Sequence, residues 1–386
     1  MSKLSPAIDS VPQSATMAMT QAAREAGPRV ISLSAGEPDF ATPEHIIEAA
    51  SRAMRDGHTG YTAVDGIPEL KDAIAEKFAR DNGLDFAPSQ ISVGPGGKAV
   101  IWNALFVTCG PGDEVIIPAP YWVSYPSMVR LTGAEPVIVP GNAAFKLTPD
   151  ALAAAITPRT RWLMLNSPGN PSGAVYSRDE LSALAKVLRA HPHVMVLSDD
   201  IYEALVYDGA FATLASVAPE LSERVLTMNG VSKAYAMTGF RIGYAGGPDW
   251  LIAAMRKFMG QTTSNPATPS QYAAVAALRG DHGFLDSWRA AYVRRRDVMV
   301  DRLSEAGLHA ETPPGAFYVF ANCEAAMGAG GFASDSDFAM ALLKEGGVAT
   351  VPGSAFGSPG HIRLSYAASN PQIAEACDRI AAFTAR

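Results

Sequence analysis

The chain has 386 residues, of which 48% are apolar and 18% are charged, a composition typical of a folded globular protein with room for two domains. Its formal net charge of -7 argues against a nucleic-acid partner, which would need a concentrated basic face. Residues 1–20 lack the apolar segment of a signal peptide and no apolar run is long enough to span a bilayer, so we expect no membrane attachment. Three cysteines without metal-ligand spacing fit a reducing compartment and predict a cytoplasmic protein with no metal site.

The first 40 residues are predicted to form an arm, because they are polar, contain prolines and end in a turn-rich run. Pro43 then opens a predicted helix with apolar residues at helical spacing, and Pro68 opens a second helix that runs through Phe78. We assign residues 1–40 to the arm and to part of a small domain, and residues 41–290 to a large domain.

A repeated pattern of strand, glycine-containing turn and helix begins near residue 91. The predicted strands are apolar throughout and cover Ile91–Val93, Glu114–Ile117, Pro136–Val139, Trp162–Leu165, Val194–Leu197 and Val225–Met228. Predicted helices include 99–108 and 178–189. Unbroken apolar strands joined by helices are typical of a mainly parallel sheet covered on both faces, so we predict the α/β fold class for the large domain.

The C-terminal region, residues 291–386, is predicted to form a smaller α+β domain to which the N-terminal arm also contributes. A long helix over 284–306 leads into it, and Ala316–Phe320 and His361–Tyr366 alternate like strands. The dipeptide Asn370-Pro371 is predicted to start the final helix, with the asparagine as its N-cap.

The stretch from Asn229 to Tyr244 carries the first chemical signal. Lys233 follows a predicted strand and a turn, and Arg241 comes eight residues later. A lysine sheltered at a strand end has its amine pKa lowered by loss of solvent and by nearby cations, and the neutral amine can form a Schiff base with an aldehyde. Arg241 can hold a phosphate. Two such residues alone would more often be a surface lysine and a structural arginine. The residues at the other strand ends therefore decide between this interpretation and a cofactor site.

The turn Gly96-Gly97-Lys98 opens a predicted helix, whose free amides and dipole can hold a phosphate. On its own this turn is a weak signal. It is not a Walker loop, because Ser92 stands where that motif needs glycine and Ala99 replaces its serine or threonine. An ATP-binding site is therefore disfavoured.

Polar and aromatic residues follow other strands, where open α/β sheets bind their ligands. Asp199 directly follows an apolar strand, where a carboxylate needs a partner, and a helical turn would bring Tyr202 near it. Trp122 either packs in the core or stacks on a flat ring, and Asn170 is either a turn residue or a hydrogen-bond donor. Arg363 is either an exposed or salt-bridged residue or a bidentate carboxylate clamp. Together these groups suit an aldehyde, a phosphate, an aromatic ring and a ring oxygen, which pyridoxal phosphate combines.

The chain resembles the class I aminotransferases, a family of fold-type I pyridoxal-phosphate enzymes, and in particular their bacterial aspartate aminotransferase branch. The resemblance runs from about Ser14 to the C-terminus. It rests on motifs in the family's order and spacing, which are Gly36-Glu37-Pro38-Asp39-Phe40, Pro120-Tyr121-Trp122, Asn170-Pro171, Asp199-x-x-Tyr202, Ser232-Lys233 and Arg363. It implies a sheet of the seven-stranded type and a homodimer with shared active sites.

The resemblance assigns roles around the cofactor. Lys233 forms the Schiff base and serves as general base and acid, and Asp199 pairs with the pyridine nitrogen. Tyr202 and Asn170 hydrogen-bond the ring oxygen, and Trp122 stacks on the ring. The phosphate is held by Ser232, Arg241, the amides of Gly97 and Lys98, and Tyr61 from the second subunit.

The resemblance also assigns the substrate contacts, which are Gly36, Trp122, Asn170 and Arg363, the last of them binding the α-carboxylate. Lys98 is the predicted partner of a distal carboxylate, with Ser14 and Thr16 as further donors. The expected reaction is a ping-pong transamination between aspartate and 2-oxoglutarate. The alternative is an aromatic amino acid or prephenate aminotransferase, because a lysine makes a point-charge contact that tolerates a bulkier carboxylate.

Two departures from the family pattern concern phosphate and substrate contacts. Gly230 stands three residues before the lysine, where many relatives carry serine, so one phosphate contact is missing or comes from Ser232. Pro12-Gln13 precedes Ser14, where close relatives usually have a basic residue and proline. Two other classes are disfavoured: a fold-related regulator would need a DNA-binding segment, and a dinucleotide-dependent dehydrogenase would need Gly-x-Gly-x-x-Gly after the first strand of a βαβ unit.

Overall fold

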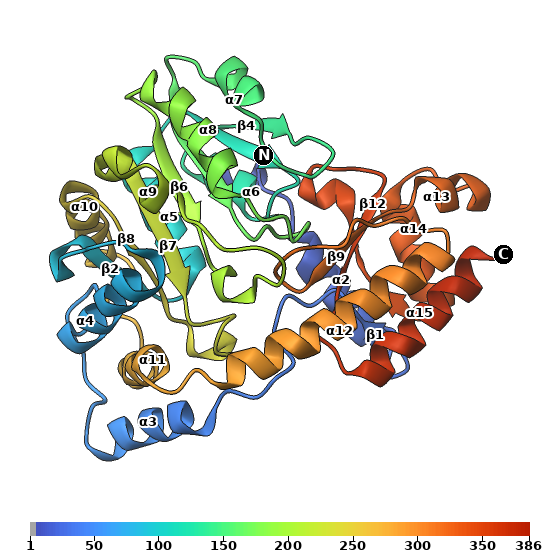
Figure 1. Cartoon of the computed structure of the whole chain (residues 1–386), viewed down its shortest axis with the longest axis horizontal. Helices are drawn as coiled ribbons and strands as arrows, with labels where there is room; N and C mark the ends of the chain where they lie inside the picture. The colour runs from blue at the N-terminus through green and yellow to red at the C-terminus, as the bar shows by residue number, and fades with distance from the viewer. Residues whose placement is uncertain (1–4) are drawn as a thin grey trace.

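The computed structural model describes residues 5–386, and its larger part is built around one seven-stranded sheet (Figure 1). The strand order is β2-β8-β7-β6-β5-β3-β4. Neighbours are parallel from β7 to β4, whereas β8 is antiparallel to both β7 and β2. The strands are β2 (Ile91–Gly94), β3 (Glu114–Ala119), β4 (Glu135–Pro140), β5 (Thr160–Asn166), β6 (Met195–Asp199), β7 (Val225–Gly230) and β8 (Gly243–Gly246). The predicted α/β class with a mainly parallel sheet is confirmed.

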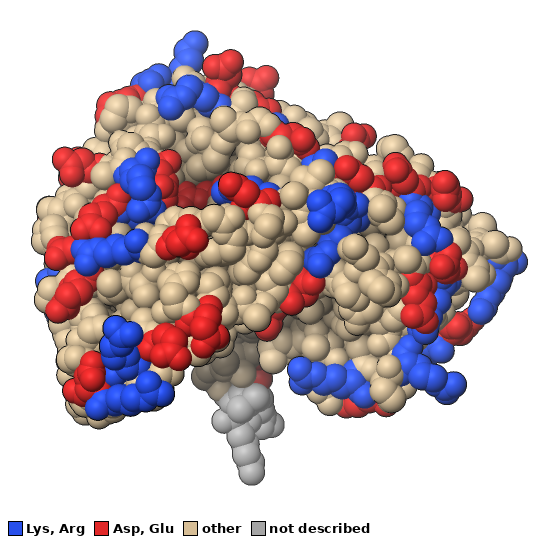
Figure 2. Space-filling model, turned by 60° about the horizontal axis from the view of Figure 1, so that its bottom comes forward, with Lys and Arg blue, Asp and Glu red and all other residues tan. Residues whose placement is uncertain are grey.

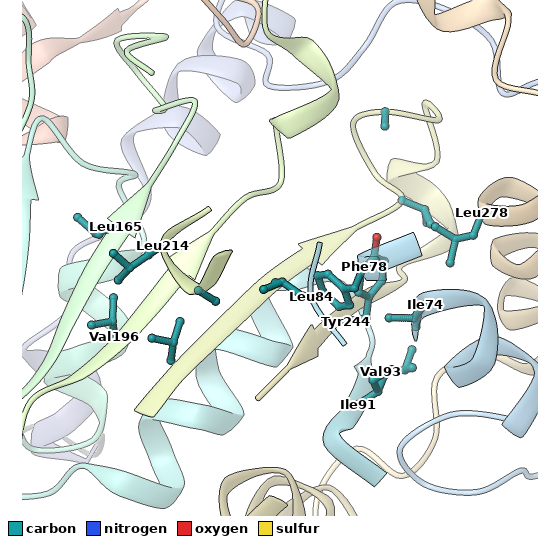
Figure 3. Packing of buried hydrophobic residues seen from close by; sticks show 14 of the residues in the cluster. Ile74, Phe78, Leu84, Ile91, Val93, Leu165, Val196, Leu214, Tyr244 and Leu278 are labelled. Atoms are coloured by element: carbon teal, nitrogen blue, oxygen red, sulfur yellow. The ribbon is translucent and has the colours of Figure 1, made fainter. Parts of the chain in front are cut away.

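Helices cover both faces of this sheet. They are α3 (Glu44–Arg55), α4 (Pro68–Lys77), α5 (Gly97–Thr108), α6 (Tyr125–Leu131), α7 (Pro149–Ala155), α8 (Arg178–Arg189), α9 (Leu214–Val217), α10 (Asp249–Met259) and α11 (Thr268–Arg279). Successive strand residues point to opposite faces: on β5, Trp162 and Met164 pack in a cluster with α5, α6 and α10. Leu163 and Leu165 join a second cluster with α4, α8 and α11, part of which Figure 3 shows. The two buried faces explain why the strands are apolar throughout.

The smaller part combines segments from both ends of the chain. Its elements are α2 (Ala15–Glu25), β1 (Ile31–Ser32), β9 (Tyr318–Asn322), α13 (Glu324–Gly330), α14 (Asp335–Ala341), β10 (Val348–Ala349), β11 (Val351–Pro352), β12 (His361–Ser365) and α15 (Asn370–Thr384). β9, β11 and β12 form an antiparallel sheet, and β1 pairs in parallel with β10. A short helix α1 (Pro6–Asp9) precedes α2.

The long helix α12 (Phe284–Glu305) runs from the larger part to the smaller part in Figure 1. Leu285 and Trp288 in its first turns pack in the core of the larger part, whereas Tyr292 and the following apolar residues pack in the core of the smaller part. The change of core falls close to residue 290, although the domain boundaries themselves stay predictions.

The final helix corrects one local prediction. Asn370 is the first residue of α15 and Ser369 is its N-cap, because the Ser369 side chain accepts a hydrogen bond from the amide of Gln372 while the Gln372 side chain accepts one from Ser369. This reciprocal pair caps the helix one residue earlier than predicted, and Pro371 still lies in the first turn.

The surface carries both signs of charge. On the face that Figure 2 shows, Lys and Arg side chains alternate with Asp and Glu side chains without a continuous basic patch. Within residues 5–386, no helix is both long and apolar enough to cross a membrane. The same residues contain no group of three or more His, Cys, Asp or Glu side chains arranged to hold a metal ion.

Candidate active site

A cavity of about 580 Å³ lies where the parallel strands of the large sheet end. Asn166 and Asp199 are the last residues of β5 and β6 and are register partners, so both point to this edge. The cavity is lined by every residue that the sequence assigned to one chain's site, namely Ser14, Thr16, Gly36, Gly97, Lys98, Trp122, Asn170, Asp199, Tyr202, Ser232, Lys233, Arg241 and Arg363. The fold thus gathers residues that are far apart in sequence, and their roles stay predictions.

Lys233 lies just after β7, and within the described part of the chain its amine forms no ion pair with an acidic side chain. Its Nζ donates a hydrogen bond to the backbone oxygen of Gly36 at 2.5 Å. Burial lowers the pKa of the Lys233 ammonium to about 8, and the charges of Arg363 and Arg241 act in the same direction, while Glu37 opposes them. At pH 7 about a tenth of Lys233 is therefore a neutral, nucleophilic amine, far more than for an ordinary lysine.

Asp199 ends β6 and is 4% exposed. Its Oδ2 accepts a hydrogen bond from the Tyr125 hydroxyl at 2.5 Å, and its Oδ1 accepts a longer one from the amide of Ile201 at 3.3 Å. Burial raises the pKa of the Asp199 carboxyl to about 6, against the hydrogen bond from Tyr125. The group is therefore an acid that is mostly ionised at pH 7 and can pair with a cation in the cavity.

Tyr202 lies in the turn after β6 and directly precedes a short 3-10 helix over Glu203–Leu205. Its hydroxyl shares a hydrogen bond of 2.8 Å with the hydroxyl of Tyr318 on β9, and its ring lies 6.0 Å from the Lys233 Nζ. Burial raises the pKa of the Tyr202 hydroxyl well above its ordinary value. Tyr202 therefore stays a neutral hydrogen-bond donor beside the reactive amine.

Arg363 on β12 is a buried guanidinium held by neutral groups, at 1% exposure. Nη1 donates to Asn170 Oδ1 at 2.9 Å and Nη2 donates to the Ser34 carbonyl at 2.6 Å, while the Tyr318 ring lies 4.5 Å from the guanidinium carbon. Its Nε has no hydrogen-bond partner among the described residues. A buried, charged group with a free donor calls for an anionic ligand, and a carboxylate fits its planar geometry.

The start of α5 and Arg241 offer a cradle for a phosphate in the same cavity. Gly96 precedes α5 with a φ of 90°, and a Cβ on it would lie 2.3 Å from Arg241 Nη2, so the turn needs glycine. Gly97 begins α5, where the amides are free of intrahelical partners. Arg241 is held with a positive φ of 56°, and its Nη1 donates to the Thr238 carbonyl at 2.8 Å. Helix amides, a guanidinium and the nearby Ser232 hydroxyl match a phosphate dianion.

Lys98 lies at the rim of this cradle and is exposed. Its Nζ is 5.0 Å from the centroid of the Trp122 ring. Partial loss of solvent and the charge of Arg241 nevertheless lower the pKa of its ammonium. This position is compatible with either a phosphate contact or a substrate contact, as the sequence left open.

Ser14, Thr16 and the two sequence departures occupy different places. Ser14 is the N-cap residue of α2, and Thr16 follows in its first turn at the cavity wall. Pro12-Gln13 is exposed and lies outside the cavity lining. A Cβ on Gly230 would lie 3.0 Å from the Ile242 carbonyl and 3.1 Å from the Ile201 side chain, so a larger residue would need its neighbours to move. A serine at this position would thus require small shifts of Ile201 and Ile242.

Tyr61 is the one predicted site residue outside the cavity lining. It is 94% exposed, in a turn that contacts α11 on both sides: Thr268 donates to the Gly60 carbonyl at 2.7 Å and Gln271 donates to the Thr62 hydroxyl at 3.0 Å. Such a side chain cannot act within its own chain's cavity. Its prediction was made for a second subunit and stays a prediction.

Sequence reasoning missed Tyr125, Tyr318 and Ser34. Tyr125 and Tyr318 bond to residues of the predicted site, but their partners are distant in sequence. Ser34 contributes only its backbone oxygen, which no side-chain motif reveals. An aromatic residue shortly after the Pro120-Tyr121-Trp122 motif was the one available signal.

The comparisons with known proteins agree on one family. The model of the family described as aminotransferase class I and II matches residues 28–380. The aspartate/prephenate aminotransferase of Cereibacter sphaeroides is 54% identical over 397 residues, covering 100% of this chain and 99% of the relative. The crystal structure of the aspartate aminotransferase from Rhizobium meliloti has a TM-score of 0.95 and 48% identity, with 100% of both chains covered. The aspartate aminotransferase of Thermus thermophilus with maleate has a TM-score of 0.94 and 43% identity, covering 99% of this chain and 100% of the other. The chain therefore belongs to the class I and II aminotransferase family.

Proposed function

We propose that this aminotransferase uses pyridoxal phosphate to exchange the amino group of aspartate with 2-oxoglutarate. The observation that carries the proposal is the meeting, in one cavity, of a lysine with a lowered pKa, a buried carboxyl and a buried arginine with a free donor. The membership of the chain in the aminotransferase family makes transamination the reaction. The choice of cofactor and of substrates is supported by the contacts described below.

The donor set fits the proposed cofactor. A phosphate suits the amides at the start of α5 together with Arg241 and Ser232, and a protonated ring nitrogen suits the buried carboxylate of Asp199. Pyridoxal phosphate supplies an electron-accepting ring that stabilises negative charge at the substrate α-carbon. Trp122 in the lining offers a flat surface for that ring.

Lys233 has the two properties that its proposed role requires. Its lowered pKa makes the amine a nucleophile that can hold the cofactor and then a base that removes the α-proton of the substrate. Within residues 5–386 its Nζ hydrogen-bonds only to the Gly36 carbonyl and forms no ion pair with a carboxylate. The Tyr202 hydroxyl, held by Tyr318, is placed to hydrogen-bond an oxygen on the same side of the cavity.

Arg363 is the proposed anchor of the substrate α-carboxylate. Asn170 and the Ser34 carbonyl hold the guanidinium from two sides, so it is oriented before the substrate arrives. The free Nε and the absence of a carboxylate partner among the described residues leave its charge for the substrate. Gly36 brings backbone close to this corner, since a Cβ there would lie 2.9 Å from the Tyr318 hydroxyl.

The distal carboxylate of the substrate is assigned to Lys98, with Ser14 and Thr16 as further hydroxyl donors across the cavity. The relative from Cereibacter sphaeroides carries both aspartate and prephenate in its name, so prephenate is the second candidate. Lys98 favours neither strongly, because an exposed ammonium at the cavity rim leaves room for a larger carboxylate.

We propose a homodimer in which Tyr61 completes the phosphate site of the partner subunit. An ordered turn presents this ring outward at 94% exposure, an unusual place for a large aromatic side chain.

The three cysteines are unpaired, which supports the cytoplasmic location.

One experiment tests the whole proposal. The purified protein should bind pyridoxal phosphate with a yellow colour that aspartate bleaches and 2-oxoglutarate restores. Borohydride reduction followed by peptide mass spectrometry should place the adduct on Lys233. An adduct on another lysine would refute the proposed site, and a panel of amino donors including prephenate-derived and aromatic ones would rank the two substrate candidates.

A further inference from the structure

Tyr125 is a buried residue that contacts two groups of the candidate site from outside the cavity. It is the first residue of α6 and is 2% exposed. Its hydroxyl donates to Asp199 Oδ2 at 2.5 Å, across 74 positions of sequence. Its ring meets the ring of Trp122 edge-on, with centroids 5.4 Å apart and an angle of 89° between planes. One side chain therefore packs against both the carboxyl and the aromatic ring proposed to hold the cofactor.

The surroundings of Asp199 make this contact important. Among residues 5–386, Tyr125 is the only side chain that donates a hydrogen bond to the Asp199 carboxyl. The amide of Ile201 reaches Oδ1 at 3.3 Å, which is long for a hydrogen bond. The other ionisable groups that influence this site are Lys233, whose charge favours the carboxylate, and Asp200 and Tyr202 from the same loop.

Resting on the proposed function, we propose that Tyr125 is a positioning residue that fixes Asp199 through Oδ2 and keeps it an acceptor for the cofactor ring nitrogen. Each carboxylate oxygen already accepts one hydrogen bond, a short one from Tyr125 at Oδ2 and a long one from the Ile201 amide at Oδ1, so both keep a further lone pair and Oδ1 is the less tightly held of the two. The orientation is set before any ligand arrives, because Tyr125 is itself fixed: its amide donates to the Trp122 carbonyl at 3.0 Å.

The charge of Asp199 follows from the same contact. Burial alone raises its carboxyl pKa, and the hydrogen bond from Tyr125 is the largest influence in the opposite direction. Burial also holds the pKa of the Tyr125 hydroxyl well above its ordinary value, so the tyrosine stays a donor throughout the working range of pH. Loss of the hydroxyl should raise the pKa of Asp199 by about one unit, as expected for a hydrogen bond to a charged group.

The test compares Tyr125→Phe with the unsubstituted chain in the binding of pyridoxal phosphate to the cofactor-free protein between pH 5 and 8.5. Below the pKa of Asp199 the carboxyl is protonated and gives up its attraction for a protonated ring nitrogen. The pH at which the dissociation constant begins to rise on acidification should move upward by about one unit. The substituted chain should thus bind about tenfold more weakly at pH 5 and almost equally at pH 8.

The matched control is Tyr176→Phe. Tyr176 is 4% exposed, and its hydroxyl accepts a hydrogen bond from the Leu147 amide at 2.7 Å, without contact to Asp199. Both variants lose one buried hydroxyl, so a purely structural effect would lower the thermal stability of both and leave the pH profile of binding unchanged. In an Asp199→Asn background, the difference between Tyr and Phe at position 125 should disappear.

The outcomes separate the two proposals. Failure of the unsubstituted chain to bind pyridoxal phosphate would refute the proposed function. Normal binding with coincident pH profiles for the unsubstituted chain and Tyr125→Phe would refute the positioning role alone. A shift of the profile that persists in the Asp199→Asn background would also refute it, because the hydroxyl would then act through another group.

Discussion

Two cavities lie on either side of Ile201 and treat their buried charges in opposite ways. The candidate active site has a volume of about 580 Å³, and the second cavity, lined by Lys77, Glu203 and Arg289 among others, about 520 Å³. Ile201 lines both. The two cavities are therefore similar in size and share one lining residue. They differ in how their charged groups are paired.

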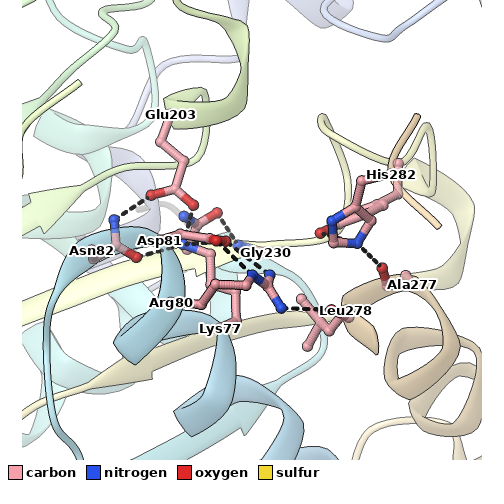
Figure 4. A network of polar contacts seen from close by, with 11 residues as sticks. Lys77, Arg80, Asp81, Asn82, Glu203, Gly230, Ala277, Leu278 and His282 are labelled. Atoms are coloured by element: carbon pink, nitrogen blue, oxygen red, sulfur yellow. Dashed lines mark hydrogen bonds and ion pairs between the residues drawn. The ribbon is translucent and has the colours of Figure 1, made fainter. Parts of the chain in front are cut away.

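In the second cavity the charges satisfy one another, as Figure 4 shows. Lys77 forms an ion pair with Glu203 and donates to Asn82 Oδ1 at 2.6 Å, and Asn82 in turn donates to Glu203 at 2.7 Å. Arg289 donates to Asp286 at 2.9 Å and to the Ala204 carbonyl at 2.7 Å. A ligand would have to compete with these internal partners.

In the candidate active site the cations are held by neutral groups. Lys233 bonds to a backbone carbonyl, and Arg363 bonds to an amide oxygen and a backbone carbonyl. Burial without an ion-pair partner among the described residues leaves Lys233 with a lowered pKa, although the charges of Glu37 and Asp199 act against the shift, and leaves Arg363 with a free donor. The comparison teaches that burial makes a lysine reactive only when no carboxylate neutralises it.

The largest expected effect comes from Lys233→Ala. It removes the nucleophile and the base together, so transamination should fall by about 10⁴-fold or more. Steady-state turnover of aspartate with 2-oxoglutarate measures this loss, and thermal unfolding should show little change. A variant that keeps a tenth of its turnover would remove the functional difference between the two cavities.

Lys77→Met tests the other buried lysine. It leaves Glu203 buried without its cation, which should destabilise the fold by about 3–5 kcal/mol. Denaturant unfolding measures the cost, while kcat of the folded protein should be retained. Loss of turnover with unchanged stability would mean that the second cavity takes part in catalysis.

Lys98→Ala asks whether the active site also uses an exposed cation. Loss of a partner for the distal carboxylate should reduce kcat/KM for aspartate by about 2–4 kcal/mol and affect phenylalanine much less. Lys257→Ala, which removes an exposed lysine on α10 outside the cavity, is the control. Equal losses for aspartate and phenylalanine would assign Lys98 to the cofactor phosphate instead.

Tyr61→Phe has the smallest expected effect and tests whether the cavity is completed from outside the chain. Cofactor binding should weaken by about 1–2 kcal/mol, the range for a hydrogen bond to a charged group. Mixing this variant with a Lys233→Ala chain should restore one fully bound site per mixed dimer. Weakening without restoration on mixing would show that Tyr61 acts within its own chain, and a fully active monomer would exclude the shared site.

The sequence predicted the central sheet because its signal is local. Each strand is a short apolar run followed by a turn, and buried parallel strands need that pattern. The positions of Asp199 and Lys233 followed, since Asp199 comes at the end of such a run and Lys233 comes after another run and a turn. Sheet order was not predictable in this way: β8 turns back antiparallel between β2 and β7, which no local residue pattern indicates.

The side-chain partners of the site were not predictable, because they depend on contacts across long separations. Tyr125 reaches Asp199 only once α6 has packed on the sheet beside β3 and β4. Helix boundaries were not predicted well either. The helix expected to end at Phe78 continues as a wider π-helical turn over Phe78–Asn82. This turn places Asn82 beside Glu203. Such a turn meets a tertiary demand that helical spacing does not encode.

The hydrogen bond from Arg363 to the Ser34 carbonyl joins segments 329 positions apart, and this separation orders events during synthesis. The groups proposed to hold the cofactor within one chain lie between Gly97 and Arg241, in the part with the large sheet, which leaves the ribosome before β12. The guanidinium proposed to recognise the substrate emerges near the end of translation, on β12. Because domains generally fold as they emerge, the growing chain builds its cofactor cradle before its substrate anchor. A nascent chain can thus meet its coenzyme before it can consume an amino acid.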